Sequence, residues 1–497
     1  MARPKGSIVG IGITLLVLLT GRIDSVSSRP AGDLSAGQGM PVIARALPAA
    51  ADVQQLVTCL SCAVSNSLTA QAATPIVYYI DDPVVVQMGA TTNVTLTLKT
   101  DGTVTTLAVD LEAGGILTAT ALATDTYRLV FTPEQALFNY SPSYNHNFVG
   151  YLRVYVGATL LGRYNLFINV SDAAVPSLLP LDLAPNVRAG IHVVNLLMPA
   201  APLGVDDADV TNLFYQFYPD TFDFINVVYA EGRFENRYHI GVSNAVQGIG
   251  VGIHDSTASY GSGGRLLGIT HFPISTVFDG AEDGYQHELG HQWINFVLEG
   301  EPHWPISELA QGIMGFSIPG SGGEGGDFPY ELAPNGDGSY TVHYNPDLRW
   351  DIGFTDLDLY LMGLLPAAQV EPALVFTNQD QAAQLHEGGI LQGPTYTVDA
   401  NTIIASYGAR VPAAGAAQRN FRVASIIVTR DRLLTPNELA FFDYMAARAS
   451  LTQPVPYSSG FVQGTARPFF LTTRGLGTLD SYMLPVGQIV FLPVVRR

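Results

Sequence analysis

The sequence predicts a protein of several domains, in which an all-β domain precedes an α+β domain. Short β-branched runs separated by turns fill residues 76–174, and strands alternate with helices over residues 178–455. One predicted helix in the second region carries two histidines four residues apart. The chain has 497 residues, 47% hydrophobic and 13% charged, which is enough for two or three folded cores.

The first 28 residues are typical of an export signal. Arg3 and Lys5 precede an apolar stretch from Ser7 to Gly21, and small residues at 25–28 provide a cleavage region. The apolar stretch is shorter than the roughly 20 residues of a membrane span. We therefore expect a secreted or extracytoplasmic protein, with an uncleaved N-terminal signal anchor at the cell surface as the alternative. We expect no other membrane span.

Residues 29–75 are rich in Ala, Pro, Gly and Ser, and they predict a linker or a propeptide. Both cysteines of the chain, Cys59 and Cys62, lie there. One C-x-x-C pair supplies too few ligands for a structural zinc site, and no thioredoxin-like βαβ pattern surrounds it. A local disulfide is the expected state in an oxidising compartment.

Residues 76–174 contain the runs expected of a β-sandwich. Val94–Leu98, Tyr127–Phe131 and Tyr151–Tyr155 alternate apolar and polar residues, and turns such as Asp101-Gly102 separate the runs. The spacing is similar to that of immunoglobulin-like accessory domains on secreted proteins. No catalytic constellation is evident in this region.

The next region, 178–455, alternates strands and one helix before the histidine-bearing helix. The predicted elements are strands Gly190–Leu197, Phe224–Tyr229, Tyr238–Val242, Gly248–Ile253 and Leu266–Phe272, with a helix at Asp206–Phe217. A strand at Phe421–Val428 and a helix that opens at Thr435-Pro436 follow later. The fold of the C-terminal extension, 456–497, is left undetermined.

The segment His287-Glu288-Leu289-Gly290-His291 is the most informative in the chain. Residues four apart lie on nearly the same face of a helix, so both imidazoles can reach one metal ion. Glu288 is then placed to contact an activated water rather than the metal. Asp279 and Glu282 form a capping pattern upstream, and Gly300 is a plausible helix end, so we expect a helix from about 279 to 299.

This HELGH segment resembles the HExxH signature of the zincin metallopeptidases. The resemblance implies Zn²⁺ held by His287 and His291, Glu288 as the general base of peptide hydrolysis, and a mixed sheet before the helix. It also implies that one of the last two strands before the helix binds an extended peptide. The metzincins place a third histidine six residues after the second, where this chain has Val297. That subclass is excluded, and no other zincin family is assigned.

A catalytic zinc site usually has three protein ligands. We favour His303, twelve residues beyond His291, because neutral imidazole suits zinc. Glu308, seventeen residues beyond His291, is an alternative. Asp356 and Asp358 are others: acidic residues followed closely by a tyrosine resemble the aspzincins, although the full aspzincin motif is not present.

Tyr360 is the candidate for a second catalytic role. It lies on a predicted helix that begins near Thr355, and zincins often add a tyrosine or histidine donor that stabilises the oxyanion. Packing in the core is the alternative interpretation of its aromatic side chain.

The net charge of −19 argues against a nucleic-acid partner, because phosphate binding needs clustered Lys and Arg. We expect a secreted zinc-dependent endopeptidase that acts on a protein or peptide. One alternative is a cell-surface adhesin or binding protein that keeps the zincin fold without catalysis. The other is a zinc hydrolase acting on a non-peptide amide or ester.

Overall fold

The computed structural model describes parts of the chain between Val77 and Val486. The described residues are 77–99, 106–111, 115–123, 126–133, 148–171, 175–201, 205–230, 238–273, 285–295, 297–298, 303–315, 330–344, 353–453 and 468–486. The predicted signal, the linker with its two cysteines, and the predicted helix start at Asp279 lie outside them. Among the residues described, no helix has the length and apolar character that a membrane span requires.

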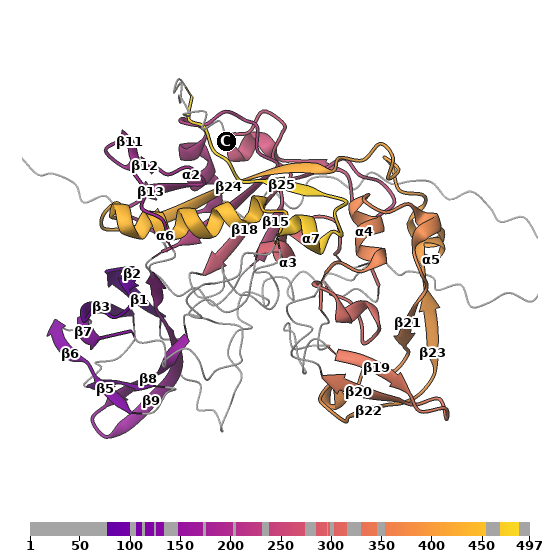
Figure 1. Cartoon of the computed structure of the whole chain (residues 1–497), viewed down its shortest axis with the longest axis horizontal. Coiled ribbons are helices and arrows are strands. Elements are labelled where there is room, and N and C mark those ends of the chain that lie inside the picture. The colour runs from indigo at the N-terminus through magenta and orange to yellow at the C-terminus, as the bar shows by residue number, and fades with distance from the viewer. Residues whose placement is uncertain are drawn as a thin grey trace, which may run out of the picture. The chain divides into compact units, whose positions relative to one another are not determined.

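The first part of the described chain consists of two four-stranded antiparallel sheets around one core (Figure 1). Val94 and Leu129 of one sheet and Val109 and Leu152 of the other are buried in that core. The strand order of the first sheet is β1 (Val77–Asp82), β3 (Thr92–Lys99), β7 (Thr126–Phe131) and β6 (Thr120–Ala123). The strand order of the second sheet is β5 (Ile116–Thr118), β4 (Thr106–Leu111), β8 (Phe148–Val156) and β9 (Thr159–Phe167). A parallel pair, β2 (Val85–Gln87) and β10 (Asn169–Ser171), completes this part.

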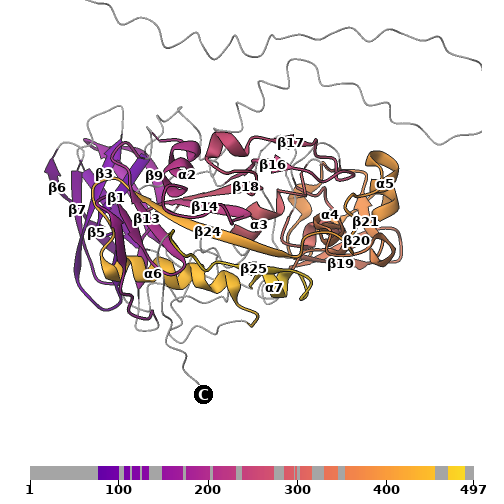
Figure 2. The same cartoon turned by 90° about the horizontal axis from the view of Figure 1, so that it is seen from above.

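The second part is built on a mixed sheet of eight strands (Figure 2). In spatial order they are β11 (Leu181–Ala184), β12 (Val187–Ala189), β13 (Val193–Leu197), β24 (Asn420–Thr429), β14 (Phe224–Tyr229), β18 (Gly268–Pro273) and β15 (Tyr238–Gly241), with β25 (Thr478–Asp480) beside the start of β24. The four strands from β13 to β18 are parallel, and β15 is an antiparallel edge. The predicted mixed sheet is therefore confirmed.

Strand β24 lies at the centre of this sheet, although it comes more than 140 residues after β18 in sequence. Its sequence explains the position: from Val423 to Thr429 every residue is apolar or small, and all are buried. A run without polar alternation is typical of a parallel strand that is covered on both faces.

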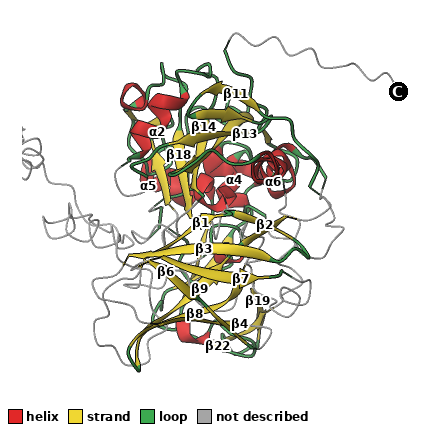
Figure 3. Cartoon of the chain, turned by 90° about the vertical axis from the view of Figure 1, so that its left-hand side faces the viewer, coloured by secondary structure: helices red, strands yellow, loops and turns green. Residues whose placement is uncertain are grey.

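Helices cover both faces of the sheet (Figure 3). The apolar residues of α2 (Asp207–Phe214) pack with Ile225 and Val227 of β14, whereas α6 (Pro436–Ala447) packs with Val228 on the opposite face. Both helices begin with a capping box, at Asp206 and at Thr435. The two predicted starts are confirmed, but α2 ends three residues before the predicted Phe217.

The third part packs small sheets and helices around a core that includes Trp304, Phe354 and Phe376. Its hairpin β19–β20 turns at residues 335–339. The elements are β19 (Tyr330–Pro334), β20 (Tyr340–Tyr344), β22 (Ile390–Leu391), β21 (Ala373–Phe376), β23 (Thr395–Val398), α4 (Asp356–Met362), α5 (Ala400–Tyr407) and α7 (Phe469–Thr472), together with a two-residue pair, β16 (Ser243–Asn244) and β17 (His254–Asp255), between β15 and β18.

The prediction of a strand at Gly248–Ile253 is wrong. Gly248 and Gly250 have φ of 77° and 80°, values that a pleated strand does not adopt. Gly248 also lies directly against the backbone of Ala409, so a side chain would not fit there. The predicted strand Leu266–Phe272 exists as β18, but it lies between β14 and β15. Neither of the two strands predicted to bind a peptide is therefore the edge of the sheet. The edge beside β18 is β15.

The helix that bears the HELGH segment is shorter than predicted. Among the described residues, α3 spans Tyr285–Gly290, and turns with i→i−3 bonds follow it through Trp293. Trp293 and Ile294 are buried in the core. The apolar spacing that predicted a long helix therefore reflects burial of these side chains in an irregular segment.

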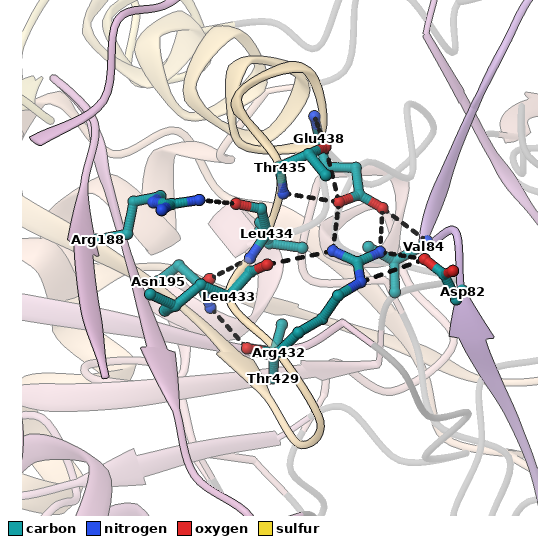
Figure 4. Close-up of polar contacts among 10 residues, drawn as sticks. All are labelled: Asp82, Val84, Arg188, Asn195, Thr429, Arg432, Leu433, Leu434, Thr435 and Glu438. Carbon is teal, nitrogen blue, oxygen red and sulfur yellow. Dashed lines mark hydrogen bonds and ion pairs between the residues drawn. The ribbon is translucent and has the colours of Figure 1, made fainter. Parts of the chain in front are cut away.

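One ion-pair network joins the sandwich to the mixed-sheet part (Figure 4). Arg432 donates to both oxygens of Glu438, at 2.7 and 2.8 Å, and to Asp82 on β1 at 2.5 Å. Val84 N also donates to Glu438 at 3.0 Å, and the side chain of Glu438 is only 4% exposed. Val84 and Val85 belong to the same apolar cluster as Val193 and Phe442. The two parts therefore share both apolar and polar contacts.

Candidate metal centre

The candidate centre begins on α3, which contacts β18 and the edge strand β15. Leu289 is fully buried in the core of the third part, and this burial orients the helix. His287 is 1% exposed, whereas His291 and His303 are half-buried. His291 lies just beyond the helix end at Gly290.

The structure brings His303 to the two histidines of the HELGH segment. The three ring centroids are 4.9 to 5.0 Å apart, so the rings form a nearly equilateral triangle. One ring nitrogen from each residue lies within 4.8 Å of the other two. Among the described residues, this is the one group of His, Cys, Asp or Glu side chains with the spacing of a metal site.

Backbone carbonyls fix the orientation of two of the rings. His287 Nδ1 lies 2.7 Å from Ile313 O, and His291 Nδ1 lies 3.1 Å from Ile294 O. A ring N–H must donate in both contacts, since a carbonyl only accepts. In the neutral rings, Nε2 then carries the lone pair. Outer contacts of this kind are those that hold metal-binding histidines in one tautomer.

The ring of His303 points its Nε2 atom at the Nε2 atom of His287. His303 Nε2 is 2.9 Å from His287 Nε2. If no cation is bound, His303 has to donate its Nε2 proton to His287, because two lone pairs repel at this distance. A divalent cation would take the place of that proton and would be held by a lone pair from each of His287, His291 and His303. The donor set of three neutral imidazoles fits Zn²⁺.

Glu288 is the acidic residue of α3 that adjoins this group. It follows His287 in the helix, and it is 4% exposed. A carboxylate in so enclosed a place is unusual in proteins unless it has partners or a chemical role.

The alternative third ligands have other partners. Glu308 Oε2 accepts from Leu374 N at 2.8 Å. Asp356 pairs with Arg474 at 2.5 Å. Asp358 caps α4 through Thr355 and accepts from Trp304 Nε1 at 2.8 Å. Burial raises the pKa of Asp358 to about 6, against the bonds from Thr355 and Trp304.

Tyr360 lies on α4 as predicted, and it is 4% exposed. Its hydroxyl has no hydrogen-bond partner among the described atoms. Tyr360 interacts with the charged side chain of Arg410. Burial lowers the pKa of Arg410 to about 10, and the interaction with Tyr360 raises that pKa in part. Tyr360 as the oxyanion donor stays a prediction.

The C-terminal extension supports α3, which the sequence did not indicate. Gln286, next to His287, accepts from Thr472 Oγ1 at 2.5 Å. Thr472 O in turn accepts from Phe354 N at 3.0 Å. Since β25 also adds to the mixed sheet, residues 468–480 are part of the structure that carries the three histidines.

A cavity of about 540 Å³ lies beside Glu308 and not at the histidines. None of the three histidines lines this cavity. Its lining includes four acidic residues and one arginine, which are Glu308, Glu331, Asp356, Glu371 and Arg474. The histidines are the candidate metal centre because their ring nitrogens converge, and the cavity lining contains no group of His, Cys, Asp or Glu side chains with that spacing among the described residues.

Comparison with known proteins finds no family model that matches the chain, no matching curated protein and no matching solved structure.

Proposed function

We propose that this protein is a secreted, zinc-dependent endopeptidase similar to the zincins. The single observation that carries the proposal is the convergence of His287, His291 and His303. Two of these rings have their Nδ1 atoms held by backbone carbonyls, which leaves Nε2 for a metal ion. Three protein ligands are the usual number at a catalytic zinc site, where a further position stays open for water or substrate.

The three histidines would hold Zn²⁺, and Glu288 would perform the proton transfers. A bound zinc ion supplies Lewis-acid activation of water and of a carbonyl group at neutral pH. Glu288 takes a proton from the attacking water and passes it to the leaving amine as the C–N bond breaks. Its place directly after His287 on α3 and its burial support this role.

Two further features of the proposal concern the surroundings of the site. The strand β15 is the antiparallel edge beside α3, and it takes the place of the two strands predicted for this role as the one to which an extended peptide substrate would add. The two four-stranded sheets, formed by β1 and by β3 to β9, are proposed as an immunoglobulin-like accessory domain, with export directed by the N-terminal 28 residues.

We expect Glu288→Gln to abolish peptide hydrolysis while zinc binding is retained. The amide keeps the size of the side chain but cannot accept the water's proton, so turnover should fall by about 100-fold to 10,000-fold. The assay is cleavage of an unstructured protein by the full chain loaded with zinc. Glu331→Gln, an exposed glutamate on β19, is the matched control and should leave the rate unchanged.

The same assay separates the two alternatives. A parent chain that binds zinc yet cleaves no polypeptide under any condition contradicts the endopeptidase proposal and favours an adhesin. Hydrolysis of small esters or amides without hydrolysis of polypeptides favours a non-peptide zinc hydrolase.

A further inference from the structure

Gln292 is held at both ends of its side-chain amide. Its Nε2 donates to Ser243 O at 2.8 Å, and its Oε1 lies 2.9 Å from His239 Nε2. Because a carbonyl only accepts, the amide nitrogen must face Ser243 and the amide oxygen must face His239. Gln292 therefore ties the segment after α3 to two residues near the edge strand β15.

The contact with Gln292 also settles the state of His239, which lies on β15. An amide oxygen accepts, so His239 Nε2 carries the proton and Nδ1 carries the lone pair. Burial lowers the pKa of His239 to about 3, with Gln292 acting against this and His291 adding to it. The ring is thus a neutral donor near the charge of the candidate metal centre.

Gly268 on β18 makes the space in which His239 and Gln292 meet. A Cβ at this position would overlap the His239 ring and would lie 2.8 Å from Gln292 Oε1. Strand β18 therefore needs a glycine at position 268, because any side chain there would occupy the space of the hydrogen bond between His239 and Gln292.

The end of α3 explains why such a tie is needed. The helix stops at Gly290, so His291 lies outside the i→i−4 ladder that would hold it on the same face as His287. The turn after the helix is fixed by i→i−3 bonds and by the side chain of Gln292, the residue next to His291.

We propose that His239 and Gln292 form a clamp that positions His291 for metal binding. The edge strand, and not the helix alone, then determines where the second histidine of the HELGH segment stands. This inference rests on the proposed metal centre and adds two positioning residues to it, which neither contact the reacting atoms nor bind the metal.

Two substitutions at one position test the clamp. In His239→Gln the amide nitrogen reaches the place of Nε2 and keeps the donor, whereas in His239→Asn the shorter amide leaves Gln292 Oε1 without it. We expect His239→Asn to weaken Zn²⁺ affinity by roughly 10-fold to 100-fold, and His239→Gln to stay within about 3-fold of the parent, as for outer contacts of metal-binding histidines. Gln292→Met, which removes both bonds, should behave as His239→Asn and serves if that variant does not fold.

The measurements are competition with a chromophoric chelator for Zn²⁺ and the visible spectrum of the Co²⁺-loaded full chain. The clamp predicts an altered cobalt spectrum in the Asn variant and a parental one in the Gln variant, a difference that loss of stability alone does not produce. Equal affinities and spectra in all chains, or equal losses in the Gln and Asn variants, overturn the clamp. A parent that binds no Zn²⁺ instead overturns the proposed function, so the two failures are distinguishable.

Discussion

Replacing His303 by alanine is expected to remove zinc binding almost completely. His303 supplies one of three converging ring nitrogens, and its Nε2 lies 2.9 Å from that of His287. Loss of a ligand should cost more than the roughly 10-fold to 100-fold that loss of an outer contact costs. The dissociation constant for Zn²⁺, measured by chelator competition on the full chain, should therefore rise by more than about 100-fold.

His343→Ala is the matched control, because His343 lies on β20 with a side chain that is 50% exposed. This variant should bind Zn²⁺ as the parent does. If His303→Ala retains parental affinity, then His303 is not a ligand, and Glu308 or the aspartates at 356 and 358 become the ones to test.

Glu438→Gln is expected to destabilise the protein by roughly 2–4 kcal/mol. Removing one partner of a buried ion pair typically costs about 3–5 kcal/mol, and we expect less here because Arg432 is 32% exposed and keeps Asp82. The amide also cannot accept all the bonds that Arg432, Val84 and Thr435 now donate. Urea unfolding followed by far-UV circular dichroism gives the free energy of unfolding.

The effect of Glu438→Gln should depend on pH. Burial raises the pKa of Glu438, but the bonds from Arg432 and Thr435 outweigh it, so its pKa lies below the ordinary 4.5. A group with a lowered pKa in the folded state stabilises the protein above its unfolded pKa, and this stabilisation is lost as pH falls through the folded pKa. The parent should therefore exceed the variant in stability at pH 7, and the difference should shrink below about pH 4.5.

Asp182→Asn provides the comparison on the surface. Asp182 pairs with Arg188 at 2.6 Å, but its side chain is 57% exposed, so loss of the charge should cost less than about 1 kcal/mol. Equal small losses for Glu438→Gln and Asp182→Asn, or a difference that does not change with pH, would contradict the role given to the network in Figure 4.

The sequence was most informative where local chemistry decides the structure. Thr435-Pro436 starts α6 and Thr355 starts α4, because a capping side chain and the next residues suffice to satisfy the first amides of a helix. Phe224–Tyr229 is a strand with the predicted ends, since the run is bounded by Asp223 on one side and by a turn that begins at Ala230 on the other.

Elements that depend on distant residues were harder to predict. The sequence indicated a strand at Phe421–Val428, but nothing local shows that it lies between β13 and β14. The segment Gly248–Ile253 has strand-like composition, yet Gly248 and Gly250 have positive φ, and Gly248 lies against the backbone of Ala409, where a side chain would not fit. Packing partners far along the chain decide both outcomes.

In the candidate site, too, the residues close to the motif in sequence were predicted, and contacts with distant residues were not. His303 was indicated because it follows His291 closely and offers the ligand that zinc prefers. His239 and Gln292 were missed, although both precede or adjoin the motif, because a pair 53 residues apart gives no periodic signal. The Thr472 contact to Gln286 spans 186 residues and could not be inferred from spacing.

The proposed function depends on one zinc ion held by His287, His291 and His303. The most direct test is the zinc content of the purified full chain, measured by elemental mass spectrometry after exposure to Zn²⁺ and removal of free metal. We expect about one zinc per chain, as for a mononuclear three-ligand site, and the loss described above in His303→Ala. A folded parent chain that holds no zinc after this treatment would contradict it.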